Sequence, residues 1–222
     1  IDRDAVRRRG ALEEVIERIH RGEVRLLVGT QMLTKGHHFP DVSLVVVLNA
    51  DQGLFGTDFR ASERLAQTIV QVAGRAGRAG RPGEVLIQTE YPEHPLLAQL
   101  VTGGYDAFAA AALAERREAA WPPYARIAVL RAEATGRAVP LEFLDQARDL
   151  AFACAEPGIE LLGPAAAPME RRAGHYRAQL LLHGPSHAPL QRLFSRWLPQ
   201  VEALPTARRV RWSLDVDPLE LF

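Results

Sequence analysis

Two arginines in a glycine-rich stretch have the chemistry to bind phosphate. Residues 71–80 read Gln-Val-Ala-Gly-Arg-Ala-Gly-Arg-Ala-Gly and follow an amphipathic segment. Arg75 and Arg78 are three apart, so on a first helical turn both guanidinium groups would project toward one ligand, and glycines such as Gly74 let backbone approach it. An arginine of this kind can stabilise the charge that develops during phosphoryl transfer. The stretch therefore predicts the arginine side of a nucleotide site; the alternative is a solvated basic turn.

The other half of such a site is not found in these residues. A P-loop needs G-x-x-x-x-G-K-[ST], because its lysine reaches the phosphates and its hydroxyl holds magnesium. Lys35 is the single lysine, and the residues around it do not fit that pattern. The chain also begins at Ile1 without a methionine. We expect a piece of a longer protein that does not hydrolyse nucleotide alone.

A second candidate segment, residues 29–40, lies between two predicted strands. Thr30, Lys35 and Gly36 supply a hydroxyl, a lysine and a glycine after the carboxyl end of the first strand. In α/β sheets this position suits contacts to phosphate or to another ligand. The alternative is an ordinary loop with a helical turn that ends at Gly36.

Composition narrows the function classes. The formal net charge is zero, so a generally cationic surface for nucleic acid is not expected and any such contact needs local arginines. Cys154 is the single cysteine, which excludes an internal disulfide framework and a cysteine-based zinc cluster in this piece. His37 and His38 have no nearby carboxylate or thiol at metal spacing, so we expect no metal site. The longest apolar run, residues 42–48, is too short for a membrane span, and a cytosolic setting fits.

The first half of the chain has the pattern of an α/β layer. Helical spacing predicts helices over 11–20 and 60–72, and short apolar runs predict strands over 24–28, 43–48 and 84–89. The nearly uninterrupted apolar run of the second strand is typical of a parallel sheet covered on both faces. Helices that alternate with such strands predict an α/β architecture.

A different order begins after the break Trp121-Pro122-Pro123, which follows a helical stretch over 105–120. The predicted elements are a strand, a helix, two strands, a helix and a strand: 124–134, 141–155, 159–164, 175–183, 188–204 and 208–216. This β-α-β-β-α-β order is that of ferredoxin-like domains. We therefore predict two domains, residues 1–120 and 121–222.

Three further groups of charged or polar residues are candidates for contacts. The first is Asp51, Asp58, Arg60, Glu63 and Arg64, which form either a solvated helix face or a support for the arginine pair. In the second domain, Arg171, Arg172, His175, Tyr176 and Arg177 either bind backbone phosphate and stack a base or form a charged hairpin, which we favour. On the last helix, Gln191, Arg192 and Arg196 line a side where an acidic peptide could dock; a solvated face is the plainer alternative.

Taken together, these segments resemble the PriA family of primosomal DNA helicases. Residues 29–40 are similar to that family's helicase motif V and residues 71–78 to motif VI, while 51–54 and 58–64 resemble the connecting segments peculiar to it. The resemblance extends through 91–95, 121–123 and 214–218, so it covers nearly the whole chain. It implies a partial second RecA-like helicase lobe over residues 1 to about 120, with parallel sheet and helices, and then the family's C-terminal domain.

The resemblance implies an ATP-driven, three-prime to five-prime unwinding activity at stalled replication forks. By position, Arg75 and Arg78 would contact the triphosphate, with Arg78 as arginine finger. Gln71 and Gly36 would contribute to nucleotide binding or to its coupling to DNA. Thr30 and Lys35 would lie near the bound strand or the lobe interface. ATP and Mg would be bound mainly by a lobe upstream of Ile1, where the zinc-binding cysteines of the parent would also lie.

The resemblance also implies partners. They are branched and single-stranded DNA, the acidic C-terminal tail of single-stranded DNA-binding protein, and other primosome proteins. Arg172 is a candidate DNA contact, and His187 and Gln191 are candidate tail contacts. Two other hypotheses remain: a non-catalytic module that only docks DNA or the tail, and a different superfamily 2 helicase that acts on RNA.

Overall fold

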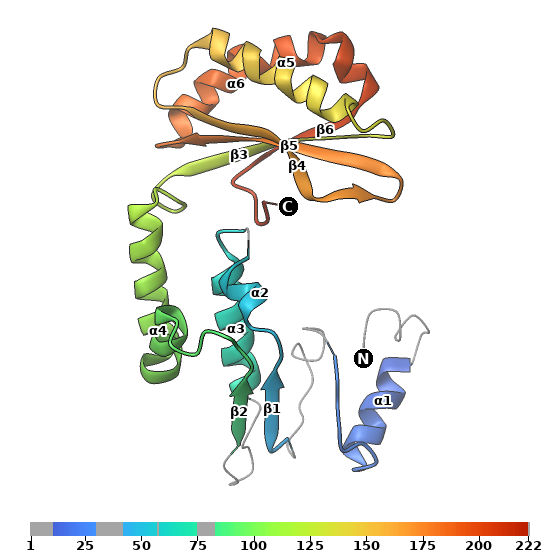
Figure 1. Ribbon diagram of the computed structural model, residues 1–222, viewed down its shortest axis with the longest axis vertical. Helices are drawn as coiled ribbons and strands as arrows, with labels where there is room; N and C mark the ends of the chain where they lie inside the picture. The colour runs from blue at the N-terminus through green and yellow to red at the C-terminus, as the bar shows by residue number, and fades with distance from the viewer. Residues whose placement is uncertain (1–10, 30–41, 57, 75–82, 222) are drawn as a thin grey trace. The chain divides into compact units, whose positions relative to one another are not determined.

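The computed structural model describes residues 11–29, 42–56, 58–74 and 83–221, and it divides into two compact units (Figure 1). The first unit is Ile1–Ala112 and the second is Leu113–Phe222. The division lies inside one long helix, α4, which spans Pro95–Glu118. The predicted domain boundary near residue 120 stays a prediction.

The first unit contains a parallel pair of strands with helices before, between and after them. Its elements are α1 (Ala11–His20), β1 (Leu44–Val47), α2 (Asp51–Leu54), α3 (Ala61–Ala73), β2 (Glu84–Ile87) and the first part of α4. The two strands pair in parallel, from Leu44 opposite Glu84 to Val47 opposite Ile87. The predictions for α1, α3, β1 and β2 are confirmed.

The predicted strand over 24–28 is wrong. Within the described residues, 24–29 carry no strand, and the side chains of Leu26 and Val28 are 80% and 67% exposed. A short apolar run gains strand geometry largely from burial against neighbours. These two side chains lack that burial, so their apolar character alone does not produce a strand.

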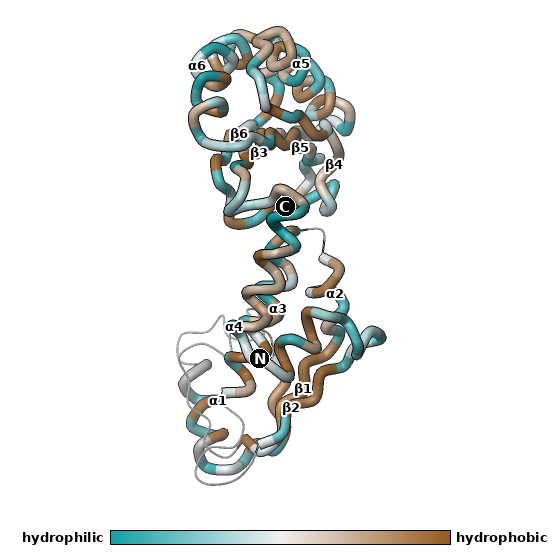
Figure 2. The backbone as a smooth tube through the Cα atoms, turned by 90° about the vertical axis from the view of Figure 1, so that its left-hand side faces the viewer, coloured by the Kyte–Doolittle hydropathy of each residue, from teal (hydrophilic) through white to brown (hydrophobic). Residues whose placement is uncertain are grey.

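The core of the first unit forms on one side of its two strands. Val47 and Ile87 pack toward a cluster of buried residues from α3 and α4: Ala66, Ile69, Leu96, Leu97, Leu100, Phe108 and Ala112. Because side chains alternate along a strand, Leu44, Val46 and Leu86 point to the other face, where each is about half exposed. Figure 2 shows β1 and β2 as apolar along most of their length. In the described residues, this sheet is therefore apolar on both faces and buried on one.

Among the described helices, α4 is long and apolar enough, by length and composition alone, to cross a membrane. Its backbone turns at Gly104, where φ is 72°, a conformation that glycine adopts without a side-chain clash. Leu96, Leu97 and Leu100 are buried in the core of the first unit. Core helices of soluble proteins share this length and composition, so these two properties alone do not assign a membrane span to α4.

The second unit has the ferredoxin-like order that the sequence predicts. Its elements are β3 (Arg126–Ala134), α5 (Val139–Cys154), β4 (Glu160–Arg172), β5 (His175–Gly184), α6 (His187–Ala203), the 3₁₀ helix η2 (Pro205–Arg209) and β6 (Arg211–Val216). The strands lie in the order β4-β5-β3-β6, with every neighbouring pair antiparallel. Both long helices cover the same face of this sheet (Figure 1). The predicted fold class is confirmed.

Alternation along β3 and β5 places one set of side chains under the helices. Ala128, Leu130 and Ala132 from β3 join Leu180 and Leu182 from β5 in a core of almost fully buried residues. Phe143 and Leu144 of α5 and Trp197 of α6 fill the space above them. The indole Nε1 of Trp197 donates a hydrogen bond to the Ala147 carbonyl oxygen, 2.7 Å away, so the largest buried ring has no unsatisfied donor.

Two boundaries in the second unit differ from the prediction by three residues or more. The strand β4 extends to Arg172 rather than ending at Pro164, and its pairing with β5 shifts between Leu162 and Ala165. Gly163, with φ of 105°, takes up this irregularity, so the pairing resumes beyond the proline. At the other end, Pro205–Arg209 form η2, so β6 begins at Arg211 and not at Arg208.

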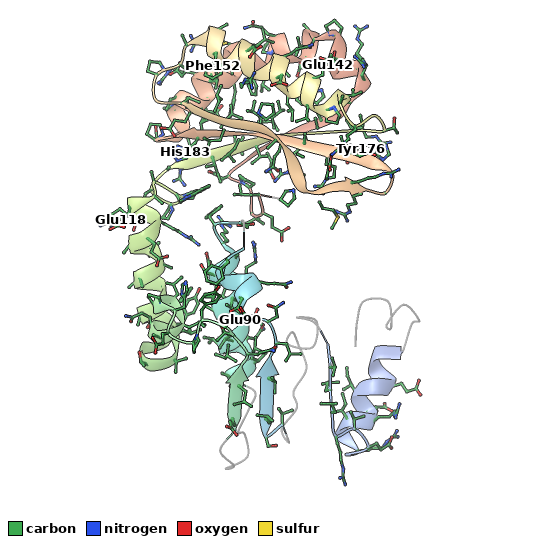
Figure 3. All side chains as sticks on the ribbon, viewed as in Figure 1. Glu90, Glu118, Glu142, Phe152, Tyr176 and His183 are labelled. Atoms are coloured by element: carbon green, nitrogen blue, oxygen red, sulfur yellow. The ribbon has the colours of Figure 1, made fainter. Side chains whose placement is uncertain are left out.

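The segment that follows α4, at Ala120 and Trp121, contacts the sheet of the second unit. The His183 Nε2 atom, on β5, lies 2.6 Å from the Ala120 carbonyl oxygen, and the rings of His183 and Trp121 are 6.5 Å apart at an angle of 67°. Figure 3 shows His183 near one end of β5 and Tyr176 near the other. The chain thus enters β3 from a point that is held by the neighbouring central strand.

Candidate functional site

Five of the predicted site residues lie outside the described residues. They are Thr30, Lys35 and Gly36 of the loop between the predicted strands, and Arg75 and Arg78 of the glycine-rich stretch. Their roles stay predictions. The described residues next to them define how the chain leads into the arginine pair.

Gln71 and Gly74 lie together at the end of α3. Gln71 is exposed on the last turn, and the Gly74 amide donates to the Val70 carbonyl oxygen at 3.0 Å. Gly74 has φ of −65°, so its backbone does not require glycine. A Cβ atom there would lie 3.4 Å from the Val70 oxygen, which is an ordinary contact. The structure places both residues directly before the arginine pair, and their predicted nucleotide contacts stay predictions.

The start of α3 is fixed by Asp58, whose side chain is only 8% exposed. Its Oδ1 atom accepts a hydrogen bond from the Arg60 amide at 2.8 Å, and its Oδ2 atom lies 3.0 Å from a guanidinium nitrogen of Arg64. The Ala61 amide donates to the Asp58 carbonyl oxygen at 2.8 Å. These contacts hold the first turn of the helix. Part of the predicted charged cluster is therefore a local anchor for α3 rather than a solvated face.

A second carboxylate joins the two connections that leave the carboxyl ends of the strands. Asp51, after β1, accepts hydrogen bonds from the Thr89 hydroxyl and from the Glu90 amide, both after β2, at 2.5 and 3.0 Å. The Ala50 amide donates to the Gln88 carbonyl oxygen at 3.0 Å. The carboxyl ends of parallel strands meet at one edge of a sheet, so these bonds fix the geometry of that edge.

Exposed aromatic rings next to this edge were missed by the sequence reasoning. The ring centroids of Phe55 and Tyr91 are 4.8 Å apart, and those of Phe55 and His94 are 5.6 Å apart, both in edge-to-face arrangements. About half of the Phe55 and Tyr91 side chains is exposed. Residues 91–95 were noted only as part of a resemblance, and no short-range pattern pairs them with Phe55.

On α6, His187 and Gln191 lie one turn apart and are both exposed. The His187 Nε2 atom is 2.6 Å from an Asp217 oxygen, so its imidazole already has an acidic neighbour. Asp217 follows β6 and has φ of 51°. The structure brings His187 and Gln191 together on one surface of α6, and their role as partner contacts stays a prediction.

The two arginines near them are engaged within the unit. Arg192 lies 2.8 Å from one carboxylate oxygen of Glu156, and Arg196 contacts the other. The Glu156 side chain is only 5% exposed, so the two guanidinium groups neutralise a nearly buried charge. An acidic peptide on α6 would compete with Glu156 for them.

The hairpin between β4 and β5 is basic at its tip. Arg172 lies opposite His175 in the pairing, and the Arg171 guanidinium is 5.2 Å from the Tyr176 ring centroid. Arg137, after β3, lies 2.6 Å from Glu170, and this hydrogen bond and charge raise the pKa of Arg137. The Arg171 guanidinium occupies one face of the Tyr176 ring, so that face is not open to a stacked base. Arg172 remains the candidate DNA contact.

No cluster of three or more histidine, cysteine or acidic side chains that could hold a metal is present in the part of the chain that the structure describes. His37 and His38 lie outside it. The expectation about metal at those two residues stays a prediction.

The comparisons with known proteins agree on two consecutive domains. Residues 7–80 match the family described as Helicase conserved C-terminal domain, and residues 117–219 match the family described as Primosomal protein N C-terminal domain. The first match includes the arginine pair, and the second covers nearly all of the ferredoxin-like unit.

Curated relatives match along the whole chain. The chain is 47% identical to the replication restart protein PriA of Haemophilus influenzae over 100% of its own length and 30% of that protein. It is 38% identical to the PriA of a Synechocystis strain, over 99% of the chain and 26% of that protein. The PriA of Treponema pallidum is 37% identical over 100% of the chain and 33% of that protein. The chain thus spans about a third or less of these relatives' length.

Proposed function

Because the chain belongs to the PriA family of replication restart proteins, we propose that it acts within an ATP-dependent DNA helicase that unwinds from three prime to five prime at stalled forks. The observation that carries this proposal is the ordered pair of domains: a helicase C-terminal domain followed by the primosomal domain, in one chain of 222 residues. This order also supports a DNA helicase over an RNA helicase of superfamily 2.

The nucleotide contacts that we assign to this chain, and those that we assign to a separate lobe, follow from the motifs in the sequence. These residues hold no P-loop, so ATP and Mg would be bound mainly by a separate lobe of the full-length protein. Arg78 would approach the γ-phosphate as arginine finger, and Arg75 would hold a neighbouring phosphate oxygen. Gln71, Gly74 and Gly36 would complete the nucleotide contacts, and Thr30 and Lys35 would face the bound strand. Zinc would belong to the parent protein outside this chain.

The test compares the full-length protein with the 222-residue chain. We expect DNA-stimulated ATP hydrolysis from the full-length protein, none from the chain alone, and a fall in kcat of about 10³-fold for Arg78→Ala in the full-length protein. Arg148→Ala is the matched control, since it removes the same charge from α5, where Arg148 bridges Asp145 and Asp149. A full-length Arg78→Ala protein with undiminished kcat would exclude the arginine-finger role.

A second candidate function is docking without catalysis, in a cytoplasmic protein that binds forked DNA and other primosome proteins. The pair His187 and Gln191 on α6 favours it, because both side chains are exposed and lie one turn apart on the same helix. Their ligand would be the acidic C-terminal tail of single-stranded DNA-binding protein. Titration of the chain with a labelled tail peptide should give binding that weakens about tenfold from low to moderate salt, since ion pairs at an exposed site are screened. A flat titration at both salt concentrations would remove this candidate.

A further inference from the structure

The face of the second sheet that carries no helix contains a pocket of about 350 Å³. Residues of β3, β5 and β6 that alternate away from the helices supply its polar lining. These residues are Arg131, Glu133, Arg177, Gln179, Arg211 and Ser213. Three of the six are arginines, so the pocket differs from the aliphatic face beneath the helices.

The pairing of the strands arranges these side chains in two rows. Glu133 on β3 lies opposite Arg177 on β5 and opposite Arg211 on β6. Two residues earlier on β3 and on the same face, Arg131 lies opposite Gln179 on β5 and opposite Ser213 on β6. Neighbouring strands are about 4.8 Å apart, so each row brings three polar side chains within reach of one small ligand.

The ion pairs leave positive charge in the pocket. Arg131 is fixed by an Asp215 carboxylate oxygen at 2.9 Å and by the Glu220 carbonyl oxygen at 2.6 Å. Arg211 lies 3.8 Å from Glu133, in a well-exposed pair that contributes little. Arg177 has no ion pair with any residue that the structure describes. Two carboxylates thus face three guanidinium groups, and the Arg177 guanidinium remains available to an anion.

We propose that this pocket, which we call the sheet-face pocket, binds the phosphate backbone of single-stranded DNA. The proposal rests on the proposed function, which supplies a DNA substrate. Arg177, Gln179 and Ser213 present a guanidinium, an amide and a hydroxyl, the groups that commonly donate to phosphate oxygens. The volume is at the small end of ligand pockets, so it takes a nucleotide-sized group and not the side of a duplex.

The aromatic lining indicates which part of the nucleotide is held. Trp212 is the aromatic residue of the pocket, and its ring lies 5.9 Å from the Phe143 ring, which belongs to the core on the helix side of the sheet. Among the described residues that line the pocket, no ring is therefore placed to stack a base. Recognition through phosphate alone is independent of sequence, and it is strongly salt-dependent.

The test measures fluorescence anisotropy of a labelled single-stranded oligonucleotide of about twenty nucleotides with the 222-residue chain. We expect Arg177→Ala to weaken binding about tenfold and to reduce the slope of log K against log salt by about 0.7, the loss of one phosphate contact. Arg177→Lys should keep that slope. Arg148→Ala, which removes the same charge on the helix side, should leave both quantities unchanged. Intrinsic tryptophan emission confirms that each variant is folded.

Competitors identify the ligand. A blunt duplex should bind more weakly than the single strand, and thymidine monophosphate or inorganic phosphate should compete only at far higher concentration, since each offers one contact. An Arg177→Ala chain that binds like the unaltered chain, a chain that does not bind, or a preference for duplex would each overturn the proposal. In the full-length protein, normal unwinding by Arg177→Ala would reject the pocket while leaving the helicase function intact.

Discussion

The two units of this chain are stabilised in different ways. In the second unit, sixteen buried residues form one core between a four-stranded sheet and two helices, and the sheet's other face is partly polar. In the first unit, seven buried residues of the described part cover one face of two strands, and Leu44, Val46 and Leu86 stay half exposed on the other. We therefore expect the second unit to be the more stable of the two, and contacts such as those of Asp58 to contribute a larger share of the stability of the first.

The distribution of tryptophan allows this difference to be measured. The three tryptophans, at 121, 197 and 212, all belong to the second unit. Tryptophan emission therefore reports the unfolding of the second unit, while far-ultraviolet circular dichroism reports both. If the two units unfold separately, tryptophan emission and circular dichroism will have different midpoints in urea. Coincident midpoints would show that the two units unfold together.

The largest expected effect comes from the centre of the second core. Trp197→Ala removes a fully buried ring and its hydrogen bond to Ala147, so we expect a loss of about 3–5 kcal/mol in the free energy of unfolding of this unit. Urea denaturation followed by the emission of the two remaining tryptophans measures the loss. Phe152→Ala is the control, because Phe152 is 61% exposed on α5 and its truncation should change stability by less than about 0.5 kcal/mol. Equal losses for the two variants would argue against a single tight core.

A smaller effect is expected at the anchor of the first unit. Asp58→Asn keeps the acceptor for the Arg60 amide but removes the charge that faces Arg64, so we expect the first unit to lose about 1–2 kcal/mol. Circular dichroism should show an earlier transition while tryptophan emission keeps its midpoint. A shift of both signals would mean that the anchor also supports the second unit.

The elements that the sequence predicts well are those with long, regular patterns. The helices at 141–155 and 188–204 and the strands between them have enough turns or alternations for burial on one side to dominate, so the ferredoxin-like order follows. The run at 24–28 is too short for that, and its apolar side chains are exposed. The helix α2 has only four residues and contains Gly53, a weak helix former, so its sequence shows no helical pattern.

The candidate sites show a similar division. The order of the motifs predicts the family, because that order is a property of sequence alone. The engagement of Arg192 and Arg196 by Glu156 could not be predicted, since Glu156 lies in a separate connection after α5. The rows of Arg177, Glu133 and Arg211 depend on strand register, which is fixed by tertiary pairing.

The position of β3 has a mechanical consequence. This strand follows directly from α4 and the Trp121 break, and it is hydrogen-bonded along both sides, from Arg126 to Ala134 against β5 and from Ala128 to Glu133 against β6. A pull on the chain along the axis of β3 would have to shear two ladders at once, instead of peeling an edge strand away one bond at a time. The contact of His183 with Ala120 shares that tension with β5 at the point of entry. The first strand of the second unit thus resists a pull along its own axis better than an edge strand would.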